Sequence, residues 1–435
     1  MSLPPSREYT IDSLSHDGKG ISRSGGKVCF IAGALPGERV KAHIQQQKSS
    51  HNNALLVSVE SASTERVAPT CPYVMQCGGC QLQHLAHSSQ LHYKQDSLLD
   101  MLQRQAGLTA ANVMAPLASQ PYHYRRRARL SVYTPNKGKP LVGFREASGH
   151  RIAEIDHCLV LVPALQHLPA ACQRLVAHFA NPKIIGHIEL AMVEHHGTDK
   201  ALVHLRTTEY PGPEDFRWLH QFANEQACLV SLQFGEDGYE SLSSDPHHIS
   251  IANNTLKMEY RGGDFMQANR PVNEQMVARV VDWMADIEGN ILDAFCGLGN
   301  FSLALAQRGH RVVGVEGNAD MVKRAQANAE AAGLDVEFLC RDLFGENKQL
   351  ARRPFAAVVL DPPRDGALAL ISELVKKKIE RIAYVSCNPA TMARDAAVLA
   401  KAGYQLQDAG IADMFPQTSH IEAMALFKYA GKRHK

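Results

Sequence analysis

The chain has 435 residues, of which 45% are hydrophobic and 21% are charged, and its formal net charge is +2. This length predicts two or three domains, and the composition excludes disordered, collagen-like and repeat proteins. No apolar stretch approaches the roughly 18 residues of a membrane span, and residues 1–10 have no export-signal pattern, so we expect a cytoplasmic protein without membrane contact. Ten cysteines in such a protein favour reduced thiols, metal ligands or catalysts over disulfides.

The N-terminal part of the chain, residues 1–68, has the pattern of a small β-barrel. Short runs of β-type residues at 28–31, 39–44 and 54–59 are separated by glycine-containing turns. Closely spaced short strands with turn signals between them are typical of small barrels. The next part, residues 69–262, has one helix pattern and several strand patterns, which predicts a central α+β domain.

Three cysteines open this central domain at the spacing C-x5-C-x2-C, namely Cys71, Cys77 and Cys80. Packing alone is a poor explanation for three cysteines within ten residues, so the spacing favours a metal site, with Cys158 as the nearest fourth ligand. Zinc sites more often pair two C-x2-C knuckles, whereas iron–sulfur clusters accept four thiolates at looser spacing. Because radical S-adenosylmethionine enzymes use a C-x3-C-x2-C motif, the spacing argues against that class.

The segment 121–151 is strongly basic, with eight Lys or Arg against one acid. Its sequence PYHYRRRARL combines cations that suit phosphates with aromatic rings that suit stacked bases. A basic strand that merely faces solvent explains the pattern equally well. The candidate RNA-binding residues are Tyr124, Arg125, Arg126, Arg127 and Arg129.

Residues 263–435 alternate strand and helix patterns, which predicts a doubly wound, Rossmann-like α/β domain. Ligands of such sheets bind beyond the carboxyl ends of the strands. The first strand is followed by DAFCGLGNFS, which has two glycines of the dinucleotide fingerprint but Ser302 at the third position. Acids end or follow three further strands, at Glu316, Asp342 and Asp361.

These acids favour S-adenosylmethionine over NAD as the ligand of the domain. A carboxylate accepts hydrogen bonds from ribose hydroxyls, and carboxylates tolerate a sulfonium cation. NAD would instead need a partner for its pyrophosphate, which a row of acids opposes.

Cys387, in YVSCNP, follows a later strand of the same sheet, and Glu422 lies in the terminal strand pattern SHIEAMALF. A cysteine at a strand end is more often a packed core residue than a catalyst. Beside a methyl donor, however, a thiolate and a carboxylate suit methylation of a carbon that is not itself nucleophilic, such as C5 of uracil. Attack of the Cys387 thiolate on C6 would activate C5, and Glu422 would then remove the C5 proton.

These segments, together with FMQAN at 265–269 and LDPPRDG at 360–366, resemble the RNA 5-methyluridine methyltransferases in order and spacing. The resemblance implies Cys387 as nucleophile and Glu422 as base. The related 5-methylcytosine enzymes use a second cysteine where this chain has Asp-Pro-Pro-Arg, so uracil is the expected base. The donor contacts that the resemblance implies are Gln267, Phe295, Asn300, Glu316, Asp342 and Asp361.

The N-terminal sequence GISRSGGKVCFIAGALPGERV is similar to a TRAM domain, an oligonucleotide-binding-type barrel of RNA-modifying enzymes. In the ribosomal-RNA members of the family, cysteines arranged as here hold a [4Fe-4S] cluster. The combination of barrel, cluster and catalytic domain therefore implies 23S ribosomal RNA as substrate, with another uridine of that RNA or a transfer RNA as the alternative. A small-molecule methyltransferase and a non-enzymatic ribosome assembly factor are further alternatives. We take a monomer as the default.

Overall fold

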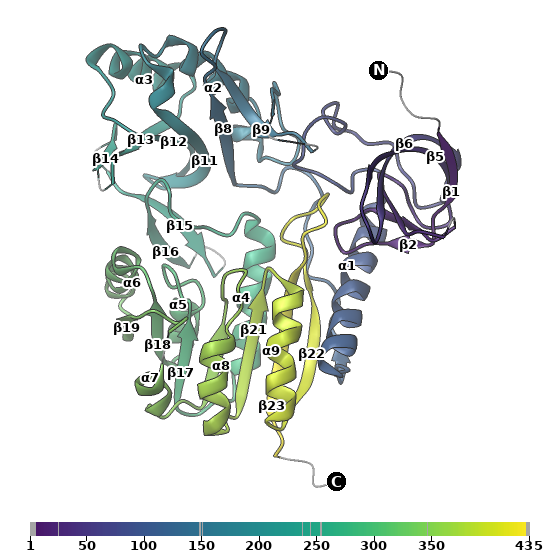
Figure 1. Cartoon of the computed structure of the whole chain (residues 1–435). Helices are drawn as coiled ribbons and strands as arrows, with labels where there is room; N and C mark the ends of the chain where they lie inside the picture. The colour runs from purple at the N-terminus through teal and green to yellow at the C-terminus, as the bar shows by residue number, and fades with distance from the viewer. Residues whose placement is uncertain are drawn as a thin grey trace.

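The computed structural model describes residues 6–24, 26–147, 149, 151–236, 238–243, 245–252, 255–345 and 347–431. Its strands form three separate sheets, and each sheet lies in a different part of the molecule (Figure 1). The chain is therefore multidomain, as the sequence predicts. Within the described residues, no helix combines the length and the apolar character needed to cross a lipid bilayer.

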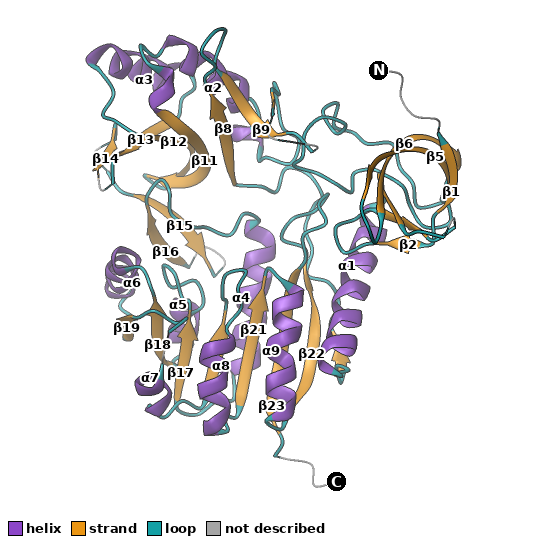
Figure 2. Ribbon diagram, in the orientation of Figure 1, coloured by secondary structure: helices purple, strands orange, loops and turns teal. Residues whose placement is uncertain are grey.

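The first sheet has six strands and curls into a barrel-like shape (Figure 2). Alternate residues of its strands point inward, as the two-residue period of a β-strand requires, and Ile31, Val40 and Ala42 belong to its small core. The spatial order is β1-β5-β6-β4-β3-β2. The strands are β1 (Arg7–Thr10), β2 (Ser13–Leu14), β3 (Gly20–Ser22), β4 (Cys29–Ala32), β5 (Arg39–Gln47) and β6 (Asn52–Ser61).

Two contacts fasten this barrel to the segment that follows it. Arg66 Nε donates to Glu38 Oε1 at 2.6 Å, and Glu38 is fully buried. The Tyr93 hydroxyl donates to the Ser15 carbonyl at 2.6 Å, which joins the barrel to helix α1 (His87–Met101).

The central sheet has nine strands, which are mostly antiparallel except that β12 and β13 run parallel. Helices α2 (Leu168–His178) and α3 (Pro213–Glu225) pack on it and share its apolar core. Its strands are β8 (Arg127–Tyr133), β9 (Leu141–Arg145), β10 (Ile152–Ala153), β11 (Ile185–His195), β12 (Thr198–Thr207), β13 (Leu229–Phe234), β14 (Gly238–Ser241), β15 (His247–Ile251) and β16 (Leu256–Tyr260).

The third sheet has eight strands in the order β19-β18-β17-β20-β21-β23-β22-β7. Parallel pairing joins β19, β18, β17, β20 and β21, whereas β23 is antiparallel to both of its neighbours. The strands are β7 (Asn112–Val113), β17 (Asn290–Ala294), β18 (Arg311–Glu316), β19 (Val336–Cys340), β20 (Ala357–Leu360), β21 (Arg381–Ser386), β22 (Tyr404–Ala412) and β23 (Glu422–Tyr429).

Helices cover both faces of this sheet, which makes it the doubly wound α/β unit that the strand-helix alternation predicts. One face packs against α4 (Arg270–Met284), α5 (Ser302–Gln307) and α6 (Ala319–Ala331). The other face packs against α1, α7 (Lys348–Arg352), α8 (Leu368–Leu374) and α9 (Pro389–Lys401). Its central strands β20 and β21 are entirely buried, as expected of a sheet covered on both sides.

The division of the chain after residue 262 is wrong for one segment. Strand β7 pairs in parallel with β22, with Asn112 opposite Asp408, and α1 packs against the same sheet through Leu98. Residues 87–117 therefore belong with the third sheet rather than with the central domain. No local pattern could reveal this, because the two partners lie 296 residues apart in sequence.

Candidate active site and cysteine cavity

The carboxyl ends of the parallel strands surround one cavity of about 680 Å³. Because β17, β18, β20 and β21 run in the same direction, the loops that follow them meet at one edge of the sheet. The cavity is lined by every residue predicted to bind the donor or to act in catalysis: Gln267, Phe295, Asn300, Glu316, Asp342, Asp361, Cys387 and Glu422.

Strand register brings Cys387 and Glu422 together. Ser386, the last residue of β21, lies opposite Ala423 of the antiparallel β23. Cys387 follows Ser386 and Glu422 precedes Ala423, so the two functional side chains come from the same end of adjacent strands. Their charges act on one another, and Glu422 is buried. A thiol and a carboxyl group therefore share one wall of the cavity.

Three acidic groups of this cavity disfavour their charged forms in the free protein. Burial and then the charge of Asp293 raise the pKa of Asp361 to about 7. Burial and then the charge of Asp361 raise the pKa of Glu422 well above its ordinary value. Burial, followed by the charges of Glu422 and Asp361, raises the pKa of the Cys387 thiol to about 11. A cation entering the cavity would stabilise all three anions, so the cavity is suited to a positively charged ligand.

Two local features partly oppose this effect at Cys387. The charge of Arg364, which also lines the cavity, lowers the pKa of the thiol. Cys387 also lies just before α9, whose N-cap Asn388 accepts a hydrogen bond from the Ala390 N–H at 3.2 Å. Helix N-termini stabilise thiolates. Asn388 also donates to the Arg364 carbonyl at 3.0 Å, which ties the two loops together.

On the donor side, backbone N–H groups hold the Glu316 carboxylate in place. Gly297 donates to one oxygen at 3.2 Å, and Gly317 and Asn318 donate to the other at 2.8 and 3.0 Å. Asn300 exchanges two side-chain hydrogen bonds with Asn273, each at 3.0 Å. These contacts fix a carboxylate and two amides on the cavity wall before any ligand enters.

Phe295 adopts a left-handed backbone conformation with φ of 64°, which is rare for an aromatic residue. The turn directs its ring toward Phe344, with the two ring centres 5.6 Å apart. Such strain at a cavity wall is typical of a functional position.

Several cavity residues were missed by sequence reasoning or received no role there. They include two aromatic residues, Phe265 at 60% and Phe344 at 51% exposure, which a soluble protein normally buries. Arg364, Phe415 and His420 are further examples. Phe265, Arg364 and His420 lie inside the motifs quoted above, so position within a motif was the available signal.

The four predicted cysteine ligands line a second cavity, of about 190 Å³, together with Arg125 and Arg129. Burial is the main reason that the pKa of Cys80 rises to about 12 and that of Cys158 to about 11. The Gly79 N–H points at Cys77 Sγ, with the nitrogen and sulfur 3.4 Å apart, as thiolate ligands prefer. The loop that contains Cys158 thus brings the fourth thiol to the cavity of the other three, and their role as metal ligands remains a prediction.

The four sulfurs are not grouped as closely as the ligands of a bound zinc ion. A tetrahedral zinc ion with Zn–S bonds of about 2.3 Å holds its sulfurs only about 3.8 Å apart. Among the described residues, the potential ligand atoms that all lie within 4.8 Å of one another belong to His195, His196 and Asp245, and no three of the four cysteine sulfurs form such a group. Which metal centre the thiols hold remains a prediction.

The arginine side chains of the basic segment differ in exposure. Arg129 is exposed and Arg125 and Arg127 are half-buried, whereas Arg126 is only 5% exposed. Arg126 and Tyr124 are therefore buried rather than on the outer surface, and their contact with RNA remains a prediction. Arg126 donates to the Gln267 carbonyl at 2.9 Å and lines the catalytic cavity. Tyr124 is 4% exposed, and its hydroxyl donates to the Pro416 carbonyl at 3.0 Å.

The comparisons with known proteins agree with this geometry. A family model described as tRNA (uracil-5-)-methyltransferase matches residues 86–429, most of the chain. The chain belongs to this family. The matched segment begins at α1, which agrees with the placement of α1 on the catalytic sheet.

Two relatives within this family match nearly the whole chain. The 23S rRNA (uracil(1939)-C(5))-methyltransferase RlmD of Pseudomonas aeruginosa is 45% identical over 97% of this chain and 94% of its own length. The protein of the same name from Shewanella sediminis is 39% identical over 96% of this chain and 95% of its own.

Among solved structures, the Pyrococcus abyssi tRNA (uracil-54, C5)-methyltransferase in complex with S-adenosyl-L-homocysteine has a similar fold. Its TM-score is 0.75 at 24% identity, and the match covers 97% of this chain and 100% of that one. The two proteins therefore share their overall fold over nearly the whole length of both chains.

Proposed function

We propose that this protein transfers a methyl group from S-adenosylmethionine to C5 of one uridine in 23S ribosomal RNA. The observation that carries the proposal is that Cys387 and Glu422 lie on the same wall of a cavity that is also lined by acidic residues. Family membership and the two RlmD relatives support the base and the RNA class. A small-molecule methyltransferase would leave the barrel and the basic strand without a use.

The reaction would begin with attack of the Cys387 thiolate on C6 of the uracil ring. The new S–C6 bond turns the ring into an enolate, and C5 then takes the methyl carbon as its bond to the sulfonium sulfur breaks. The Glu422 carboxylate removes the C5 proton. The C6–S bond breaks, the thiolate leaves and the double bond returns.

Binding order follows from the electrostatics of the free cavity. A pKa of about 11 keeps the Cys387 thiol protonated at neutral pH, and the raised pKa of Glu422 favours its protonated form. A sulfonium beside them favours the thiolate and the carboxylate, so the donor prepares both groups. Its contacts would be Gln267, Phe295, Asn300, Glu316, Asp342 and Asp361.

The target uridine has to leave any stacked helix, at a cost of a few kcal/mol. The exposed ring of Phe265 at the cavity offers a surface on which a flipped base can stack. Arg125, Arg127 and Arg129 would meet phosphates beside it, and the N-terminal barrel would act as a TRAM-type RNA-binding domain.

For the second cavity we propose a [4Fe-4S] cluster held by Cys71, Cys77, Cys80 and Cys158. The four thiols line one cavity, and their C-x5-C-x2-C spacing in the sequence, looser than paired C-x2-C zinc knuckles, supports this choice over zinc. Nothing in the methyl transfer consumes electrons, so the cluster would order the loops that present Arg125 and Arg129 to RNA.

The test uses anaerobically purified protein, S-adenosylmethionine and unmodified 23S ribosomal RNA that carries tritium at uracil C5. Tritium release that maps to one uridine and vanishes in Cys387→Ala supports the proposal. Release from transfer RNA alone would keep the chemistry and overturn the RNA class. Absence of release from both RNAs would overturn the chemistry.

A further inference from the structure

The loop between β22 and β23, residues 413–421, leads directly into Glu422 and contributes Phe415 and His420 to the catalytic cavity. It is not a regular turn. Gln417 has a left-handed backbone with φ of 69°, a conformation that costs a residue with a side chain about 1 kcal/mol or more. Contacts from outside the loop must therefore hold its shape.

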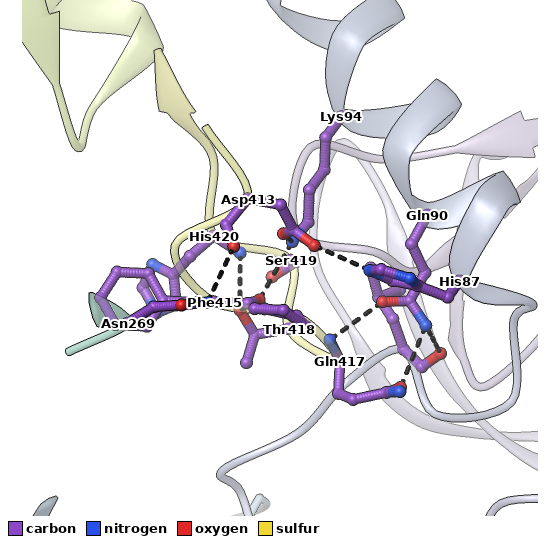
Figure 3. A network of polar contacts seen from close by, with 12 residues as sticks. His87, Gln90, Lys94, Asn269, Asp413, Phe415, Gln417, Thr418, Ser419 and His420 are labelled. Atoms are coloured by element: carbon purple, nitrogen blue, oxygen red, sulfur yellow. Dashed lines mark hydrogen bonds and ion pairs between the residues drawn. The ribbon is translucent and has the colours of Figure 1, made fainter. Parts of the chain in front are cut away.

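Those contacts come from helix α1, more than 300 residues earlier in the chain (Figure 3). Lys94 Nζ donates to Asp413 Oδ1 at 2.6 Å and to the Phe415 carbonyl at 3.0 Å. His87 Nε2 lies 3.0 Å from the other oxygen of Asp413. Lys94 and Asp413 are both buried, so water cannot replace either partner.

A second set of contacts holds the strained residue itself. Gln90 Oε1 accepts from the Gln417 N–H at 2.9 Å, and Gln90 Nε2 donates to Gln417 Oε1 at 3.0 Å. The backbone N–H groups of Gln81 and Leu82 both donate to the Gln417 carbonyl, at 3.0 and 2.9 Å. Polar groups of α1 and of the segment after the cysteine loop thus converge on one residue, Gln417.

Burying a lysine and an aspartate is costly, and an apolar pair would stabilise the fold at least as well. The pair does have a geometric use. Although burial raises the pKa of Asp413, hydrogen bonds and charges from His87 and Lys94 outweigh it and hold that pKa below the ordinary value. An ionised Asp413 fixes the start of the loop, and Lys94 fixes the Phe415 carbonyl two residues further on.

We propose that Lys94 and Asp413 are positioning residues that set the place of Glu422 for removal of the C5 proton. The inference rests on the proposed function, because it assigns the pair to the last step of that reaction. Cys387 lies on a different element, between β21 and α9, so the pair should leave the thiolate attack unaffected. The expected defect is therefore confined to the step after methylation.

The test separates the two steps with two RNA substrates. A 5-fluorouridine RNA reports formation of the covalent adduct, since its C5 carries no proton for Glu422 to remove. The tritiated RNA reports proton removal. In Lys94→Met we expect adduct formation within about twofold of the wild-type rate and tritium release slowed by on the order of 10- to 100-fold, the cost of a displacement near 1 Å.

A double variant separates positioning from stability. Lys94→Met combined with Asp413→Leu removes both buried charges, so thermal stability should return toward that of the wild type, while tritium release stays slow. Arg66→Met is the matched control, because it breaks a buried ion pair at the barrel without touching the loop, and its two rates should keep the wild-type ratio. Gln90→Met, which removes the contacts to Gln417, replaces Lys94→Met if that variant does not fold.

Equal slowing of both steps in Lys94→Met, or recovery of tritium release in the double variant, would overturn the inference and leave the pair a purely structural role. A wild-type protein that neither forms the adduct nor releases tritium would instead overturn the proposed function.

Discussion

The catalytic cavity holds one half-buried thiol, Cys387, among carboxyl groups, whereas the cysteine cavity holds four thiols beside Arg125 and Arg129. Burial raises the pKa of thiols in both places. The two cavities differ in the charges that surround their thiols and in the secondary-structure elements that form their walls. The catalytic cavity is built on the ends of regular strands, and the cysteine cavity on loops that only meet in the folded chain. The same side chain therefore suits a transient bond in one cavity and a permanent ligand role in the other.

The largest effect should follow from removing the catalytic thiol. Cys387→Ala should reduce methyl transfer by at least roughly a thousandfold, because no other thiol of that cavity can reach C6 in its place. Cys296, the other cysteine there, is buried, and burial raises its pKa well above the ordinary value. Tritium release and adduct formation on 5-fluorouridine RNA measure the loss. Residual adduct in the variant would show that another nucleophile acts.

In the other cavity, Cys158→Ala should abolish iron binding without removing the nucleophile. The iron content of anaerobically purified protein should fall from about four atoms per chain to below one. Binding of S-adenosylmethionine, measured by calorimetry, should stay unchanged, because its predicted contacts all line the catalytic cavity. Retention of iron by the variant, or zinc in place of iron in the wild type, would contradict the cluster assignment.

A smaller effect concerns the charge of the donor. With a pKa of about 11, the Cys387 thiol is protonated at neutral pH, so its alkylation rate should rise about tenfold per pH unit until the pH nears that value. A sulfonium lowers this pKa, whereas the uncharged thioether of S-adenosylhomocysteine does not. At pH 8, alkylation of the Cys387 peptide, followed by mass spectrometry, should therefore be several-fold faster with the methyl donor bound. Equal rates with both ligands would refute this electrostatic role.

The smallest effect is expected at the exposed end of the basic strand. Arg129→Gln should weaken 23S ribosomal RNA binding a few-fold and reduce the slope of log affinity against log salt by about one. Lys377→Gln, in the short 3-10 helix that follows α8, is the control and should change neither quantity, because Lys377 is exposed. Filter binding at several salt concentrations measures both. An unchanged slope in Arg129→Gln would place the RNA elsewhere.

Sequence reasoning succeeded where local pattern decides structure. Alternation of strand and helix patterns located the strand ends, and a polar residue after a buried strand has to lie at the shared edge of a parallel sheet. That is why Glu316, Asp361 and Cys387 could be placed together from the sequence and do line one cavity. The role of each of these residues remains a prediction.

Sequence reasoning failed where contacts are long-range in sequence or where polar and apolar residues do not alternate. Because four of the five residues at 125–129 are arginines, the sequence does not show which face of the strand is buried, and the burial of Arg126 could not be deduced. Tyr124 is buried by a loop almost 300 residues away. Lys94 and Asp413 lie 319 residues apart, and nothing near either of them marks a buried ion pair.

The distance between α1 and its partners also bears on how the chain folds during synthesis. At translation rates of about 5–20 residues per second, the 319 residues from Lys94 to Asp413 take about 16–64 s to emerge. For most of that time β22, against which α1 packs in the folded chain, has not yet been synthesised. Three of the four side chains that α1 buries are polar, Gln90, Lys94 and Gln95, whereas Leu98 and the partly buried Leu91, Leu99 and Met101 supply its apolar contact with the sheet. The ion pair and hydrogen bonds between α1 and the loop before Glu422 can therefore form only after almost the whole chain has been synthesised.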